Sequence, residues 1–162
     1  MSVRMKSAVG EIQRYRKSCK TRFWQNIFQA EAEYLLCHLR TCRNVLSVGC
    51  GPAIVEGMLV RDGFNIVGLD VDVAKLGSAP DTVLSVVGRA ERMPFASASF
   101  DAVIFVASLQ LIENYREAVA EARRVLRKNG RLIIMLLNPA SLFFRAKLCD
   151  SRSYVRKLRH RD

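Results

Sequence analysis

The sequence predicts an α/β fold, a three-layer αβα sandwich around a mostly parallel sheet of about five strands. Its 162 residues fit one domain. Short, nearly continuous apolar runs alternate with helix-like segments along residues 44–137. Strands that are apolar on both faces are typical of parallel sheets covered by helices on each side. Glycine, asparagine and proline residues separate these runs, as expected of the connecting loops.

The elements follow one another in a regular order. A helical pattern covers residues 11–40, with Thr21 as a candidate break or N-cap. The predicted strands are residues 44–48, 65–70, 82–87, 102–106 and 131–137. The predicted helices between them are residues 53–62, a single turn at 74–76, and 115–128 with a stop signal at Asn129-Gly130. A last amphipathic helix is expected over residues 141–158.

Charge divides the chain into three segments, which we expect to be a basic helical segment (1–43), a core (44–137) and a second basic helical segment (138–162). Residues 1–22 hold seven basic residues and one acidic, and residues 145–162 hold seven basic and two acidic. These two ends account for the whole net charge of +11. Two interpretations of these ends stay open: an electrostatic footprint for RNA or another polyanion, or two solvated basic helices.

Composition argues against a membrane span and against a secreted protein. The apolar stretches are too short to cross a bilayer, and no apolar signal segment follows Met1. The five cysteines are odd in number and include no C-x-x-C pair, which predicts reduced thiols in a cytoplasmic protein. Cys37, His38 and Cys42 match no standard zinc spacing, so no metal site is predicted.

A glycine turn after the first predicted strand points to nucleotide binding. The apolar run 45–48 ends at Gly49-Cys50-Gly51, a helical pattern follows, and Asp70 closes the next strand. This is the order of a nucleotide-binding βαβ unit, in which Asp70 is placed to accept hydrogen bonds from ribose hydroxyls. Glycines let the backbone approach a ligand closely. A dinucleotide fingerprint needs a third glycine where Ile54 stands, which argues against an NAD-dependent oxidoreductase.

Several chemistry-bearing residues fall at the ends of predicted strands. Gly49, Asp70, Ala90 and Ser108 all lie at or just beyond the carboxyl end of one of the first four strands. Right-handed crossovers place the first strand centrally, and ligands of such sheets bind at the carboxyl ends of the strands. We therefore expect these residues to meet at one crevice.

Four segments together carry a family resemblance. Gly49-Cys50-Gly51-Pro52-Ala53 is similar to G-x-G-x-G, and residues 88–95 to G-D-A-x-x-L-P-F. Residues 99–103 are similar to S-F-D-x-V, and residues 121–132 to E-x-x-R-V-L-K-P-G-G-x-L. In this order the four segments resemble class I S-adenosylmethionine-dependent methyltransferases, specifically the type 11 methyltransferase domain family. The resemblance implies a Rossmann-like fold, S-adenosylmethionine as cofactor, and methyl transfer to an acceptor, with a small molecule favoured over RNA.

The resemblance also implies a set of cofactor contacts. The glycine loop would line the methionine part, Asp70 the ribose and Val71 the adenine. The Ala90 backbone would meet the adenine edge, and residues 106–108 would line the pocket beyond the fourth strand. The cofactor-binding candidates are Ser47, Gly49, Cys50, Gly51, Asp70, Val71, Arg89, Ala90, Val106 and Ser108.

Three of these positions depart from the family pattern. Ser47 stands where the family usually has an acidic residue, Ala53 replaces a glycine, and Arg89 replaces an aspartate that accepts from the adenine amino group. Either the family varies here, or cofactor binding is weakened or altered. A non-catalytic methyltransferase-like binding or scaffold module, and an RNA methyltransferase that uses the basic ends, therefore stay open as alternatives.

Two further points concern catalysis and the end of the fold. No catalytic residue is assigned, and Glu113, His38 and Tyr15 are candidates by chemistry alone. Residues 138–162 read as helix, so the antiparallel strands that usually close the family's sheet are missing. The fifth strand would then be an edge, which natural sheets cover or pair. This predicts a chain that is part of a longer protein, or a homodimer mate or other partner at that edge.

Overall fold

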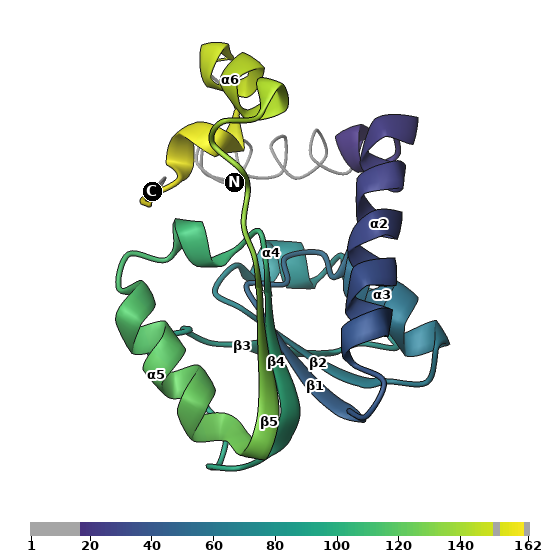
Figure 1. Ribbon diagram of the computed structural model, residues 1–162, viewed down its shortest axis with the longest axis vertical. Coiled ribbons are helices and arrows are strands. Elements are labelled where there is room, and N and C mark those ends of the chain that lie inside the picture. Colours follow the sequence, from purple (N-terminus) through teal and green to yellow (C-terminus); the bar gives the residue numbers. More distant parts are fainter. Residues whose placement is uncertain (1–16, 151–152, 161–162) are drawn as a thin grey trace, which may run out of the picture.

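A parallel sheet forms the centre of the computed structural model, which describes residues 17–150 and 153–160 (Figure 1). The strands run in the order β3-β2-β1-β4-β5, and each neighbouring pair is parallel. They are β1 (Asn44–Val48), β2 (Asn65–Asp70), β3 (Leu84–Val87), β4 (Phe100–Val106) and β5 (Leu126–Met135). The predicted fold class and the central position of the first strand are confirmed.

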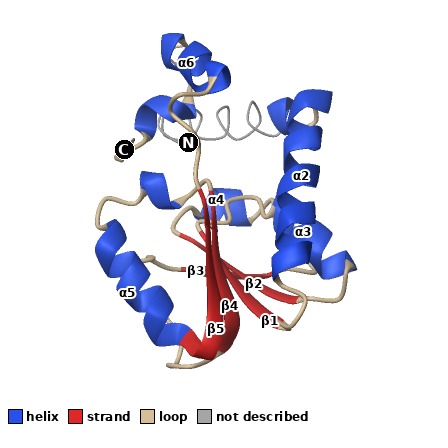
Figure 2. Ribbon diagram, viewed as in Figure 1, coloured by secondary structure: helices blue, strands red, loops and turns tan. Residues whose placement is uncertain are grey.

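Helices cover both faces of this sheet (Figure 2). On one face lie α2 (Arg22–His38) and α3 (Ile54–Arg61), and on the other lies α5 (Tyr115–Val125). The short helix α4 (Val73–Leu76) follows β2, and the single turn η1 (Leu109–Leu111) follows β4. Two short helices, α6 (Leu142–Cys149) and η2 (Tyr154–Lys157), come after β5.

Successive strand residues point to opposite faces and thereby form two cores. On the α2–α3 side, Val45 and Ile104 are fully buried against Leu35 and Leu59. On the α5 side, the buried residues of β1 and β4 pack against the helix, with Ala118 and Ala122 fully buried. The small residues on α5 let this helix lie close to the sheet. On the other side, α2 contributes buried residues to the core and is part of the fold.

The boundary between α5 and β5 differs from the prediction. The helix ends at Val125 rather than at 128, and Leu126 already pairs with Phe100 of β4. Ala102 pairs with Arg131, so the residues between are looped out of register. Asn129, with φ of 63°, lies in this bulge. The Asn129-Gly130 pair thus lies in an irregular strand and does not end a helix. The sequence alone does not separate the two cases, because a helix end and a strand bulge can both use a left-handed residue.

The other boundaries shift for local reasons. The helix expected at 53–62 begins only at Ile54 because Ala53 is left-handed. The single helix expected at 141–158 is two short ones: α6 ends at Cys149, and Ser153 caps η2 by accepting from the Val155 N–H. Thr21 is the N-cap of α2, while residues 17–19 are helical before it. The part of the predicted first helix at 11–16 lies outside the described residues.

The starts of three strands are tied together by one carboxylate. Asp101 accepts hydrogen bonds from the Arg43 N–H (2.9 Å) and the Asn44 N–H (2.8 Å), and from the Arg127 guanidinium (2.5 Å). These contacts lower the pKa of Asp101, and the hydrogen bond from the backbone N–H of Asn44 contributes most. The aspartate of the S-F-D segment therefore aligns β1, β4 and β5 at the end of the sheet opposite to the cleft described below.

The last strand is an edge of the sheet. Within residues 17–150 and 153–160, β5 pairs only with β4, and no antiparallel strand follows it. Leu132 and Ile134 of β5 are 37% and 38% exposed. In the same described part of the chain, no helix combines the length and the apolar character needed to cross a membrane.

Candidate functional site

The glycine loop after β1 is built from left-handed residues. Gly49 has φ of 72°, Gly51 of 55° and Ala53 of 51°. The Gly49 N–H donates to the Leu69 carbonyl at 2.7 Å, which fixes the turn against the end of β2. Ala53 holds the same conformation with a Cβ, which costs about 1–2 kcal/mol relative to glycine. Ala53, which stands where the family pattern has glycine, is therefore a residue with a strained backbone.

The two glycines are required for different reasons. A Cβ on Gly49 would lie 2.6 Å from Ser108 Cβ, so this glycine lets the ends of β1 and β4 approach. Ser108 also donates its hydroxyl to the Val48 carbonyl at 2.6 Å and joins the same strand ends. A Cβ on Gly51 would meet only Lys75 Cδ at 3.8 Å, so this face of the loop is open.

Asp70 ends β2 and holds the loop in place. Its Oδ2 accepts from the Gly51 N–H and its Oδ1 from the Asp72 N–H, both at 2.8 Å. Each carboxylate oxygen has a second lone pair, so both can still accept from a ligand hydroxyl. Val71, the next residue, is 64% exposed. The end of β2 thus offers a fixed carboxylate beside an open apolar surface.

Ser47 lies behind the loop and is bonded to a residue that the sequence did not single out. Its hydroxyl donates to Glu56 Oε1 at 2.5 Å, and the two residues are 1% and 3% exposed. Burial raises the pKa of Glu56, and the Ser47 hydroxyl partly opposes this. Glu56 is an acidic residue in the otherwise apolar start of α3, and this was the feature of the sequence that could have indicated a buried carboxyl.

Cys50 packs beneath the loop. A Cβ on Gly68 of β2 would lie 2.7 Å from Cys50 Sγ, so the glycine at 68 makes room for the thiol. Burial raises the pKa of Cys50, with the charges of Glu56 and Asp70 adding to the effect. The thiol is therefore held neutral, which makes it a packing group and not a nucleophile.

A cleft of about 1210 Å³ opens at the carboxyl ends of the strands. This exceeds the 300–1,000 Å³ common for ligand pockets. Nine of the ten predicted cofactor residues line it, and Ser47 does not, although Glu56, to which it donates a hydrogen bond, does. Glu113 also lines it. His38 does not, since it is exposed and stacked on Tyr34 at the other end of α2, and Tyr15 lies outside the described residues.

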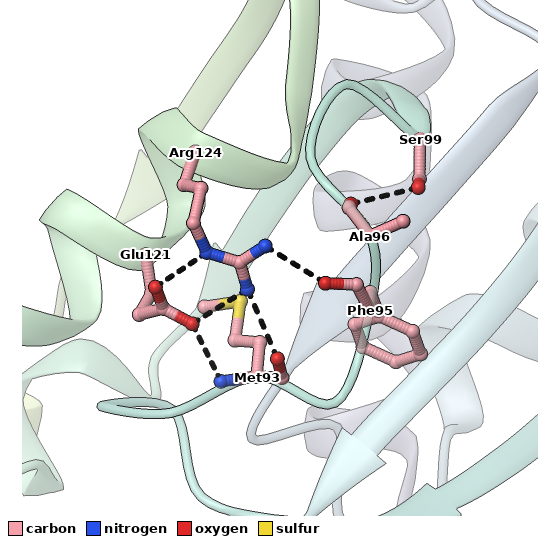
Figure 3. Close-up of polar contacts among 6 residues, drawn as sticks. All are labelled: Met93, Phe95, Ala96, Ser99, Glu121 and Arg124. Carbon is pink, nitrogen blue, oxygen red and sulfur yellow. Dashed lines mark hydrogen bonds and ion pairs between the residues drawn. The ribbon is translucent and has the colours of Figure 1, made fainter.

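The loop after β3 reaches the cleft through Arg89 and Ala90. Arg89 pairs with Glu91 at 3.1 Å, which directs its guanidinium along the loop. Further on, α5 holds the loop by its backbone (Figure 3). Arg124 donates to the carbonyls of Phe95 (2.8 Å) and Met93 (3.0 Å), and the Met93 N–H donates to Glu121 at 2.8 Å.

The opposite wall of the cleft comes from α2, α6 and η2. It includes the aromatic residues Trp24, Phe28, Phe143 and Tyr154 together with Glu31. Burial, and then the charge of Glu56, raises the pKa of Glu31 to about 7. Burial also raises the pKa of Tyr154 to about 12, with the charge of Glu31 contributing. The cleft that the glycine loop lines therefore also holds, on α2, a carboxyl whose pKa lies near neutrality.

No group of three His, Cys, Asp or Glu side chains that could hold a metal ion occurs among the residues that the structure describes. The polar groups at the cleft suit an organic ligand, with a carboxylate for hydroxyls and an exposed apolar residue for a ring.

Comparison with known proteins agrees with this geometry. Residues 46–134, more than half of the chain, match the family model described as "Methyltransferase domain". Demethylmenaquinone methyltransferase of Mycobacterium marinum is 33% identical over 102 residues, which are 62% of this chain and 44% of that protein. The chain spans less than half the length of the curated relatives it matches.

Solved structures give the same family. The PH0226 protein of Pyrococcus horikoshii superposes with a TM-score of 0.71 at 25% identity, over 81% of this chain and 62% of that one. TM1293 of Thermotoga maritima, a SAM-dependent methyltransferase described as a possible histamine N-methyltransferase, gives 0.66 at 25% identity, over 75% and 57%. The chain belongs to the class I S-adenosylmethionine-dependent methyltransferases, in the type 11 methyltransferase domain family.

Proposed function

We propose that this chain carries the cofactor site of an enzyme that transfers a methyl group from S-adenosylmethionine to a small-molecule acceptor. The observation that supports it best is the meeting of three features at one end of the cleft. These are the open side of Gly51, the fixed carboxylate of Asp70 and the exposed side chain of Val71. The cleft volume of about 1210 Å³ leaves room for an acceptor beside a nucleoside.

The residues present fit this cofactor. Asp70 would accept from the ribose hydroxyls with its remaining lone pairs, and Val71 would lie against the adenine ring. The backbone of Ala90 would meet the adenine edge, and the Glu121–Arg124 pair fixes the same loop three residues further on, at Met93. When bound, the cofactor supplies a methyl group that is electrophilic because its sulfur is cationic. The chain then has to align the acceptor and exclude water, and proximity does much of the catalysis.

Glu56 compensates for the absence of an acidic residue at position 47. Its carboxyl lies beside Ser47 and also lines the cleft. An ammonium group placed next to it would favour its charged form and so offset the rise in pKa that burial causes. We therefore propose that the Ser47–Glu56 pair faces the ammonium end of the cofactor.

The acceptor class and the cellular setting are further parts of this proposal. The names of two relatives above, demethylmenaquinone methyltransferase and possible histamine N-methyltransferase, refer to small-molecule acceptors, which supports an acceptor of this class. The five cysteines are free thiols, which supports a reducing compartment such as the cytoplasm. The basic ends favour RNA as the alternative acceptor, and RNA binding would weaken steeply as salt rises.

Calorimetric titration tests the cofactor site. S-adenosylmethionine and its demethylated product should each bind with one-site heat, and NAD should not bind. Glu56→Gln should weaken S-adenosylmethionine binding about tenfold or more, because a charged partner of the ammonium is lost. Asp62→Asn, an exposed change at the end of α3, is the matched control. Absence of heat from a folded sample would contradict the proposal, and binding without methyl transfer would support the non-catalytic alternative.

A further inference from the structure

An aromatic cluster lines the part of the cleft that α2, α6 and η2 form. Phe23 stacks on Phe143 with ring centroids 5.3 Å apart, and Trp24 stacks on Phe28 at 5.8 Å. Trp24 also contacts Phe143 edge-on at 5.6 Å and Tyr154 at 6.3 Å. These contacts join α2 to α6 and η2, and the rings of Trp24, Phe28, Phe143 and Tyr154 line the cleft. Such a wall presents ring faces and edges to a flat ligand.

Glu31 belongs to the same wall and is not used by the fold. It lies two turns after Trp24 on α2 and lines the cleft. In the described part of the chain, no residue donates a hydrogen bond to its carboxyl or forms an ion pair with it. The charge of Glu56 acts on the Glu31 carboxyl, and the charge of Glu31 acts on the Tyr154 hydroxyl. A carboxyl that is partly buried and has no hydrogen-bond or ion-pair partner among the described residues is available to a ligand.

The charges around the wall select the kind of ligand. Four basic residues and one acidic residue of α6 and the segment after it line the cleft on this side, so its charge is positive: Lys147, Asp150, Arg156, Lys157 and Arg159. Lys147 lies 5.9 Å from the Phe143 ring, where it already makes a cation–π contact. A cationic amine would be repelled by these charges, while a ring that becomes partly negative during the reaction would be stabilised.

We infer that this wall is the acceptor subsite, that it takes an aromatic ring bearing an ionisable hydroxyl, a phenol or quinol, and that Glu31 accepts the hydroxyl proton. The inference rests on the proposed methyl transfer and adds the acceptor class and the base. The aromatic residues hold the ring, and the basic residues stabilise the developing oxyanion.

The reaction step balances without a further reactant. The hydroxyl proton passes to a Glu31 carboxylate oxygen as a bond forms between the acceptor oxygen and the methyl carbon. The bond from that carbon to sulfur breaks, and its electron pair remains on sulfur, which becomes neutral. The proton on Glu31 leaves to solvent when the product dissociates.

The step requires Glu31 in its charged form, and its surroundings set the pH at which this form is present. The ionisable groups that act on it are Glu56 of α3 and Tyr154 of η2, and the charged residues Lys147, Asp150, Arg156 and Lys157 line the same side of the cleft. Since burial raises the pKa of Glu31 to about 7, the rate should rise with pH through about 7 and then level off.

The test uses the full chain and two probes that share one ring system, 1-naphthol and 1-naphthylmethylamine. Binding of each is measured by calorimetry in the presence of S-adenosylhomocysteine, and methyl transfer with S-adenosylmethionine is followed from pH 5.5 to 8.5. The variants are Glu31→Gln, Trp24→Leu and the matched control Glu33→Gln, an exposed residue of the same helix. Cofactor affinity and thermal unfolding of each variant show whether the fold is intact.

We expect 1-naphthol to bind at least tenfold more tightly than the amine. Trp24→Leu should weaken the binding of 1-naphthol about tenfold. Glu31→Gln should lower kcat/KM about 100-fold or more and remove its rise with pH, while Glu33→Gln changes neither. Tighter binding of the amine, no binding of either probe, or an unchanged pH profile in Glu31→Gln would overturn the inference. If the unmodified chain does not bind the cofactor, the proposed function is overturned instead.

Discussion

Glu121 and Arg124 lie one turn apart on α5 and together hold the backbone of Met93 from both sides. Glu121 accepts from the Met93 N–H at 2.8 Å, Arg124 donates to the Met93 carbonyl at 3.0 Å, and their side chains are paired at 2.6 Å (Figure 3). Two of the segments that resemble the family, 88–95 and 121–132, are therefore in direct contact. The E-x-x-R pattern fixes the loop that carries Ala90 to the cleft.

Arg124→Ala should release this loop. The variant loses charge-assisted hydrogen bonds to two carbonyls and to Glu121, which should lower the free energy of unfolding by about 1–3 kcal/mol. Urea denaturation measures this change. Arg123→Ala, an exposed neighbour on the same helix, should change stability by less than about 0.5 kcal/mol. Equal effects of the two substitutions would show that the pair does not hold the loop.

The two loop glycines should respond differently to alanine. Gly49→Ala combines a left-handed Cβ with a 2.6 Å approach to Ser108, and we expect a loss of about 2–5 kcal/mol. Gly51→Ala meets only the end of the Lys75 side chain and should cost about 1–2 kcal/mol, the strain alone. Its new methyl group lies in the cleft, so cofactor affinity should fall in a protein that still folds. Thermal unfolding and calorimetry separate the two effects, and equal stability of the two variants would contradict this account.

Ala53→Gly should be nearly neutral although Ala53 is fully buried. Relief of the left-handed strain, about 1–2 kcal/mol, offsets the greater freedom of glycine in the unfolded chain and the loss of a buried methyl, about 0.8 kcal/mol. Ala118→Gly, also fully buried but within α5, has no such relief and should cost about 2 kcal/mol. Denaturation midpoints compare the pair, and a larger loss at position 53 than at 118 would disprove the strain at Ala53.

Glu31 should make stability depend on pH near neutrality. The pKa of Glu31 is about 7 in the folded protein and 4.5 in its ordinary environment. Between these values the folded state keeps a proton that the unfolded state has lost, so the free energy of unfolding falls as pH rises through this window. Glu31→Gln should flatten this slope, and Glu33→Gln should not. Urea titrations from pH 4.5 to 8 measure it, and an unchanged slope in Glu31→Gln would show that the carboxyl is not buried as described.

Much of the fold was predictable because its strands are apolar on both faces. β1 and β2 have the predicted bounds, since each is closed by glycine or aspartate at a strand end. The end of α5 was not predictable, because Asn129-Gly130 serves equally as a helix stop and as part of a strand bulge. The break between α6 and η2 depends on Ser153, which is a weak signal alone.

The candidate site was predictable where backbone geometry defines it and less so where side chains from distant segments meet. Gly49, Asp70 and Ser108 follow from their positions at strand ends. Glu56 could not be paired with Ser47 from sequence, since a helical acidic residue usually faces solvent. Glu31 and the aromatic wall depend on how α2 and α6 meet above the sheet, which no local pattern specifies.

The central claim is that the glycine loop, the end of β2 and the loop after β3 together bind S-adenosylmethionine. Titration of isotope-labelled protein with S-adenosylhomocysteine, followed by backbone amide NMR, tests this most directly. We predict saturable shifts at Gly49, Gly51, Val71 and Ala90, with little change at Asp101 or Arg127 on the opposite end of the sheet. Absence of saturable shifts, or shifts centred away from the carboxyl ends of β1 and β2, would contradict it.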